Sequence, residues 1–229
     1  MAPLPALQQE VIACRRCPRL VAWRERVARE KRTRYRAEVY WGRPLPSFGD
    51  PAGRVLVIGL APAAHGGNRT GRMFTGDGSA DWLARALHVA GFANQPTSRS
   101  RDDGLALTDA YITAAVRCAP PANKPTRQEF ANCHPYLVRE IRLLPRLRVV
   151  VALGRLAFDA FLAACPAIGL TIPRPKPTFG HGLVHRLGPL TLIACYHPSQ
   201  QNTQTGRLTA AMLLRVFRQA RRLAATGAG

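Results

Sequence analysis

The stretch Arg54-Val-Leu-Val-Ile-Gly-Leu60 is a short apolar run that passes directly into a loop of small residues. Such a run is typical of a strand that is buried on both faces of a parallel sheet. Three further runs, at residues 110–116, 148–153 and 190–195, have the same character. The sequence therefore predicts four core strands.

Helical patterns separate these strands. They lie at about residues 80–90, 127–143 and 154–164, and an amphipathic pattern follows at about 207–224. Strands that alternate with helices need right-handed crossovers, which put helices on both faces of the sheet. We expect an α/β fold, namely a three-layer α/β/α sandwich around a four-stranded, mainly parallel sheet.

The length of 229 residues, 47% of them hydrophobic, suits one domain because a chain of this size can bury roughly 70% of its unfolded surface. We expect a single domain over residues 1–229, with a basic helical segment at 1–45 and a core at 46–229. No apolar run reaches the length of a membrane span, and residues 1–10 lack the order of a signal peptide. A cytoplasmic, nucleoid-associated protein without membrane contact is expected.

The charge balance points to a polyanionic partner. The chain has 33 Lys and Arg against 13 Asp and Glu, a net charge of +20. Ten basic residues fall between Arg15 and Arg36, against two acids, Glu25 and Glu30. Such an imbalance favours binding to nucleic acid.

Six cysteines in a chain of this kind indicate metal or redox chemistry rather than a disulfide framework. Cys165 and Cys195 lie in apolar runs and are interpreted as core residues. The other four consist of a C-x-x-C pair and two cysteines that flank a Pro-rich loop, and they could hold either a structural zinc ion or a 4Fe-4S cluster. These candidate ligands are Cys14, Cys17, Cys118 and Cys133.

A Gly-rich loop at residues 61–78 follows the first strand. It lacks the Gly-Lys-Ser/Thr ending of a phosphate-binding loop, so that function is rejected. It offers instead backbone amides, one aromatic ring at Phe74 and one acid at Asp77. Alternatively, Phe74 is a core residue and Asp77 caps the following helix.

His197 follows the last strand and opens a polar segment that runs to Arg207. The carboxyl ends of parallel strands are where open sheets bind ligands. An exposed loop with little to bury is expected there, with His197 at its base.

These motifs together resemble the uracil-DNA glycosylase superfamily, specifically its iron–sulfur family 5 branch. The resemblance runs from Cys14 to Leu223 and rests on five stretches of the chain. They are the C-x-x-C pair, Gly-Leu-Ala-Pro-Ala after the first strand, Gly-Arg-Met-Phe-Thr-Gly-Asp, Arg-Cys-Ala-Pro-Pro-Ala-Asn-Lys-Pro and His-Pro-Ser.

The resemblance implies a 4Fe-4S cluster on the four cysteines, ahead of zinc, and a site for a flipped base. Phe74 would stack on that base and His197 would bond its O2 edge. Asp77 would position or activate water, and Asn123 would help to hold water or substrate. Backbone amides near Leu60 and Ala61 would stabilise the departing base. In the DNA contact, the segment that starts at Gln200 would wedge into the gap and Arg207 would bind phosphate.

Two departures from related branches suggest a broader substrate range. Small apolar residues stand at Ala61–Ala63, where other branches carry an acid or Asn, and Ala114 stands where family 4 has an Asn. A roomier pocket that accepts other deaminated bases, such as hypoxanthine or xanthine, is expected.

The sequence thus predicts a monomeric, monofunctional DNA N-glycosylase. It would flip uracil or a related base out of double-stranded DNA and hydrolyse the N-glycosidic bond, leaving an abasic site. The alternative is a non-catalytic nucleic-acid-binding module with a structural four-cysteine zinc site.

Overall fold

A computed structural model describes residues 3–226, which contain one six-stranded sheet in the order β1-β3-β2-β4-β6-β5. β2, β3, β4 and β6 pair in parallel, whereas β1 and β5 pair antiparallel at the two edges. The strands are β1 (Phe48–Gly49), β2 (Val55–Gly59), β3 (Ala110–Ala114), β4 (Val149–Leu153), β5 (Val184–Leu187) and β6 (Leu190–Cys195).

The predicted α/β sandwich is confirmed, but the sheet has six strands rather than four. The four predicted strands are the parallel ones, in which every residue is buried. β1 has only two residues, and three of the four residues of β5 are not buried. Neither edge strand therefore produces the apolar run by which the others are found.

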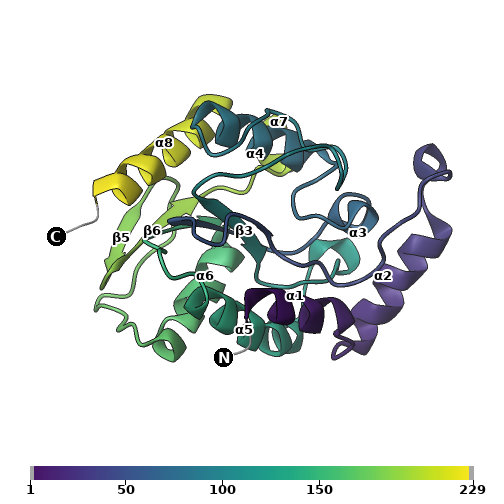
Figure 1. Ribbon diagram of the computed structural model, residues 1–229, viewed down its shortest axis with the longest axis horizontal. Helices are drawn as coiled ribbons and strands as arrows, with labels where there is room; N and C mark the ends of the chain where they lie inside the picture. The colour runs from purple at the N-terminus through teal and green to yellow at the C-terminus, as the bar shows by residue number, and fades with distance from the viewer. Residues whose placement is uncertain (1–2, 227–229) are drawn as a thin grey trace.

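Helices cover both faces of the sheet (Figure 1). α4 and α8 lie on one face, and α5 and α6 lie on the other. The helices are α1 (Leu4–Ala13), α2 (Pro18–Glu30), α3 (Gly67–Thr70), α4 (Gly78–Val89), α5 (Arg127–Arg142), α6 (Arg155–Ala164), α7 (Gln200–Gln204) and α8 (Ala210–Thr226), with 3-10 turns η1 (Thr33–Tyr35), η2 (Pro121–Asn123) and η3 (Pro166–Ile168).

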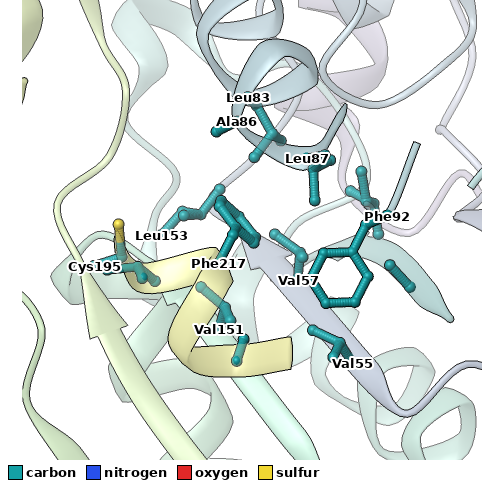
Figure 2. Close-up of a cluster of buried hydrophobic side chains, with 14 of the residues drawn as sticks. Val55, Val57, Leu83, Ala86, Leu87, Phe92, Val151, Leu153, Cys195 and Phe217 are labelled. Atoms are coloured by element: carbon teal, nitrogen blue, oxygen red, sulfur yellow. The ribbon is translucent and has the colours of Figure 1, made fainter. Parts of the chain in front are cut away.

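Alternate residues of the buried strands supply two separate cores, because successive side chains point to opposite faces. Val57 packs with α4 and α8, and Figure 2 shows it beside Phe217 of α8. Its neighbour Ile58 packs in the core under α5 and α6. In residues 3–226 no helix combines the length and apolarity needed to cross a bilayer.

A buried ion pair fixes the chain between β3 and α5. Arg117 pairs with Glu140 of α5, and both side chains are almost wholly shielded from solvent. Gln8 of α1 donates to the same carboxylate over 2.8 Å. A buried pair is costly to break once formed, so this network holds α1 and α5 in register beside Cys118.

Candidate active site

The Phe74 ring covers the end of β2. A Cβ built on Gly59, the last residue of β2, would lie 2.7 Å from Cε2 of that ring. Phe74 itself has φ +46°, a left-handed conformation that costs free energy in a residue with a side chain. Part of the ring packs on the core, so the core interpretation is correct in part. The strained backbone directs the rest of the Phe74 ring over the carboxyl end of β2.

His197 lies beside this ring. The two ring centroids are 5.8 Å apart and the planes are tilted by 32°. The His197 backbone carbonyl accepts a hydrogen bond from Asn202 Nδ2 over 2.9 Å, which fixes the chain after β6. Burial lowers the pKa of His197 to about 4. The imidazole is therefore neutral near pH 7 and can donate a hydrogen bond without carrying charge.

Asp77 caps α4, as the alternative interpretation predicts. Its Oδ1 accepts a hydrogen bond from the Ala80 backbone N–H over 2.9 Å. Its Oδ2 faces the loop after β2, since a Cβ built on Gly66 would lie 2.0 Å from that atom. Burial raises the pKa of the carboxyl group, against the hydrogen bonds from the helix N-terminus. The cap uses one oxygen and leaves the other directed to the loop.

Leu60 and Ala61 connect this site with the cysteines. The Leu60 carbonyl accepts from the Val116 N–H over 2.9 Å, which extends the pairing of β2 with the chain after β3. Ala61 packs against a buried cluster that includes Cys17 and Cys118. The first loop of the site thus rests on the cysteine region.

The segment after His197 is not the open loop expected from its polarity. Ser199 caps the short helix α7, which begins at Gln200, by accepting from the Asn202 N–H over 3.4 Å. The Gln200 amide nitrogen lies 3.7 Å from the Cβ position of Gly78, next to Asp77. Arg207 is exposed, with its guanidinium carbon 4.6 Å from the centroid of the Tyr196 ring. The Ser199 cap favours a helix start at this point, which explains why the hydrophilic stretch that follows is helical.

Asn123 lies on the turn between β3 and α5. It lies exposed at the end of η2, with φ +56°, after Ala122 with φ +52°. Its backbone N–H donates to the Pro120 carbonyl over 3.2 Å, and within residues 3–226 its side chain makes no hydrogen bond. The sequence did not indicate this turn, because its backbone depends on two left-handed residues other than glycine.

The four predicted cysteine ligands line one small cavity, although they come from distant parts of the chain. Cys14 and Cys17 lie between α1 and α2, Cys118 follows β3, and Cys133 belongs to α5. Within residues 3–226, which hold all six cysteines, none forms a disulfide.

Two side chains donate to these sulfurs. Arg24 Nη1 lies 2.9 Å from Cys118 Sγ, and Asn132 Nδ2 lies 3.2 Å from Cys17 Sγ. Burial raises the pKa of Cys118 to about 12 and that of Cys133 to about 11. These buried sulfurs would carry charge only beside a strong cation, which is the chemistry of thiolate ligands to a metal.

Sequence reasoning missed Arg69, a buried arginine in the first loop. Its Nε donates to the His65 carbonyl and its Nη2 donates to the Gly76 carbonyl, each over 2.9 Å. It therefore braces the turn that carries Phe74 and Asp77. One more arginine in an arginine-rich chain gives no signal of such a role.

Comparison with known proteins places these features in a family. Residues 46–221 match the family model of the uracil DNA glycosylase superfamily. The chain is 53% identical to a type-5 uracil-DNA glycosylase of Thermus thermophilus over 220 residues, covering 96% of this chain and 97% of the relative. It is 53% identical to one of Mycobacterium tuberculosis over 216 residues, covering 93% and 79% respectively.

A type-4 uracil-DNA glycosylase of Archaeoglobus fulgidus is more distant, at 28% identity over 201 residues, which are 87% of this chain and 83% of the relative. The type-5 matches span nearly all of this chain at about twice that identity. This chain therefore belongs to the uracil-DNA glycosylase superfamily, in its type-5 family.

Proposed function

We propose that this protein is a DNA repair glycosylase that flips uracil out of duplex DNA and hydrolyses its N-glycosidic bond. The observation that carries the proposal is the pair of rings, Phe74 and His197, at the carboxyl end of the sheet, with the Asp77 carboxylate against Gly66 of the loop that also carries Phe74. The +20 charge suits a DNA partner. Its relatives' names agree with this activity.

The first task is to hold a base that has left the stack. Leaving costs a few kcal/mol, and the cost is lowest for a mispaired base. Phe74 supplies the face on which the flipped base stacks, and this contact offsets part of the cost. The neutral His197 ring donates to the base O2, and backbone amides of Leu60 and Ala61 add further donors.

The second task is to replace the base by water. The oxygen of water bonds to C1′ of the sugar while the bond from C1′ to the base nitrogen breaks. The electron pair of the broken bond leaves with the base. Asp77 orients the water and takes its proton on the oxygen that does not accept from the Ala80 N–H. Donors aimed at the developing base anion lower the barrier, as in an oxyanion hole. The products are a free base and an abasic site.

We assign Asn123 to the substrate rather than to the water. Its turn is exposed and therefore accessible to a DNA strand. Gln200, at the start of α7, is the residue proposed to enter the gap, and Arg207 is proposed to bind a phosphate. Action as a monomer on chromosomal DNA in the cytoplasm is part of this proposal.

The four cysteines are proposed to hold a 4Fe-4S cluster. Their sulfurs line one cavity, and two of them, those of Cys17 and Cys118, accept hydrogen bonds from side chains. Yet in residues 3–226 no three His, Cys, Asp or Glu side chains are arranged to hold a metal ion. The type-5 family to which the chain belongs favours the cluster, and a zinc ion on the same four sulfurs is the alternative. When bound, the cluster would tie the start of α2 to β3 and α5, which is a structural role.

A wider substrate range is also proposed. Ala61 and Ala63 are half-buried in the first loop, and Ala114 is buried at the end of β3. Small side chains at these positions leave room for the two rings of hypoxanthine or xanthine. They also supply no amide to select uracil alone.

Single-turnover excision tests the proposal. The protein is incubated with labelled duplexes that hold one uracil, hypoxanthine or xanthine, and alkali then cuts any abasic site. Breaks at the modified base alone are expected, and the rates rank the substrates. His197→Gln is compared with His88→Gln, whose side chain is exposed on α4. Tight DNA binding without breaks would instead support the non-catalytic module.

A further inference from the structure

A basic arm projects from the molecule between α2 and β1. Residues 31–39, defined here as the basic arm, stand out beyond the end of α2 at the upper right of Figure 1. Within residues 3–226 none of the arm's cations forms an ion pair with a carboxylate. These cations are Lys31, Arg32, Arg34 and Arg36.

The arm also carries an apolar tip. Val39 is 91% exposed, more than any other large hydrophobic side chain in the described residues. A single exposed valine is ordinary on a protein surface. Here it stands at the end of a segment in which three of the six other exposed residues are arginines, so the arm presents charge and apolar surface together.

A buried arginine fastens the arm to the site. The Arg69 guanidinium carbon lies 3.9 Å from the centroid of the Tyr35 ring, and Arg69 pairs with Glu38, the one acid of the arm. The same guanidinium donates to the Gly76 carbonyl over 2.9 Å, in the turn that carries Phe74 and Asp77. Arg69 therefore contacts the arm and the base-binding turn at once.

The chain after the arm is fastened to the same loop. The Tyr40 hydroxyl lies 3.1 Å from His65 Nδ1, and the Trp41 N–H donates to the Arg69 carbonyl over 2.9 Å. The fixed segment begins directly after Val39. The arm thus stands beside the loop that follows β2, at the edge of the sheet where the base would bind.

We infer that the basic arm is a second DNA contact, in which its arginines bind phosphates and Val39 packs against the duplex beside the flipped nucleotide. This inference rests on the proposed function, because that function places DNA at this edge of the sheet. Duplex DNA matches both properties of the arm, since it carries phosphates on its backbone and apolar sugar and base surfaces in its grooves. Apolar side chains that enter a groove help to open a base step.

The test separates charge from apolar contact. One variant carries Arg32→Gln, Arg34→Gln and Arg36→Gln. Its control replaces three exposed arginines near the amino ends of the strands, on the side of the sheet opposite to the site. Arg146 precedes β4, and Arg218 and Arg222 lie on α8. The end of α8 lies at the amino end of β2, because the Ala224 carbonyl accepts from Arg54. Fluorescence anisotropy measures the Kd for undamaged duplex over a range of salt. Circular dichroism confirms that each variant is folded.

The arm variant should bind undamaged duplex roughly 10-fold or more weakly at low salt. The slope of log K against log salt should fall by about 2.7, or 0.9 for each lost phosphate contact, whereas the control should change the slope far less. Equal slopes for the arm variant and the control would overturn the inference. An arm that served an acidic protein would leave both readouts at wild-type values, which also overturns it.

Val39→Ser tests the tip. It should lower affinity for a duplex with an uncleavable abasic analogue by roughly 5- to 20-fold, with the salt slope unchanged, and Val39→Leu should restore the affinity. Equal affinity for wild type and Val39→Ser would refute the role of the tip. If the wild type fails to excise uracil while the arm variants still lose DNA affinity, the proposed function fails and the arm stands. If the wild type excises uracil normally while the arm variants bind DNA as tightly as wild type, the proposed function stands and the inference about the arm fails.

Discussion

The Asp77 carboxylate fills the space that a side chain on residue 66 would need. A Cβ on Gly66 would lie 2.0 Å from Asp77 Oδ2, while Oδ1 accepts a hydrogen bond from the Ala80 N–H. One carboxylate thus holds a helix end with one oxygen and faces the catalytic loop with the other. Its two roles can be separated by substitution.

Asp77→Asn should remove the catalytic role and keep the cap, because an Asn side-chain oxygen also caps a helix. The single-turnover excision rate should fall by about 100- to 10,000-fold, with DNA affinity and Tm nearly kept. Asp77→Ala should lose about 1 kcal/mol of stability as well. Asp102→Asn, at an exposed site, is the control. A collapse of affinity with an unchanged rate would leave Asp77 as a cap alone.

The excision rate should fall as the pH is lowered. Burial raises the pKa of Asp77, so the carboxylate that takes the proton of water is lost at a higher pH than for an ordinary Asp. His197, with a pKa near 4, stays neutral over the same range. Single-turnover rates between pH 5 and 8 measure the effect. The residual rate of Asp77→Asn should not fall at low pH in this way. An equal fall in that variant would show that another group causes the pH dependence.

Gly59→Ala should act through Phe74. The added Cβ would lie 2.7 and 2.8 Å from two ring atoms, so the ring must move from its place over β2. The loss of base stacking should cost about 1–3 kcal/mol of affinity for a uracil-containing duplex. Binding of Gly59→Ala, Phe74→Ala and the double variant measures the coupling. Two residues that act through one contact give a double variant little worse than Phe74→Ala, and full additivity would reject the link.

His197 should make the fold sensitive to acid. The unfolded chain takes up a proton on this ring below about pH 6.5, but the folded chain does so only near pH 4. Stability is therefore lost as the pH falls through this window, by about 2 kcal/mol between pH 8 and pH 5 from this ring. Urea unfolding at both pH values measures it. His197→Gln should lose about 2 kcal/mol less than wild type over the interval, and an equal loss would show that the ring does not contribute.

The cysteine site should hold iron. Cys118→Ser removes one of the four sulfurs that line the cavity, so iron content and visible absorbance should fall and Tm should drop. Cys165→Ser is the control, since that buried thiol lies in the core at the end of α6. Elemental analysis of both variants and the wild type decides the matter. Zinc in place of iron in the wild type would restore the alternative metal.

The parallel core could be predicted because its strands are buried on both faces, as in residues 55–59. β5 could not, since Val184 and Arg186 are exposed and the strand gains its place only by pairing with β6. Phe74 and His197 follow β2 and β6, whose carboxyl ends lie on the same side of the sheet although β4 stands between them; the rule that ligands bind beyond these ends directs attention to both loops. The turn that carries Asn123 depends on backbone angles that its neighbours in sequence do not specify.

The two lateral edges of the sheet are formed by short antiparallel strands, β1 and β5. β1 has two residues and β5 has four. Each margin thus offers few unpaired backbone groups to a strand of another molecule, which is how natural sheets avoid aggregation. Short edge strands therefore protect a protein that is concentrated along a polyanion from fibril-like self-association.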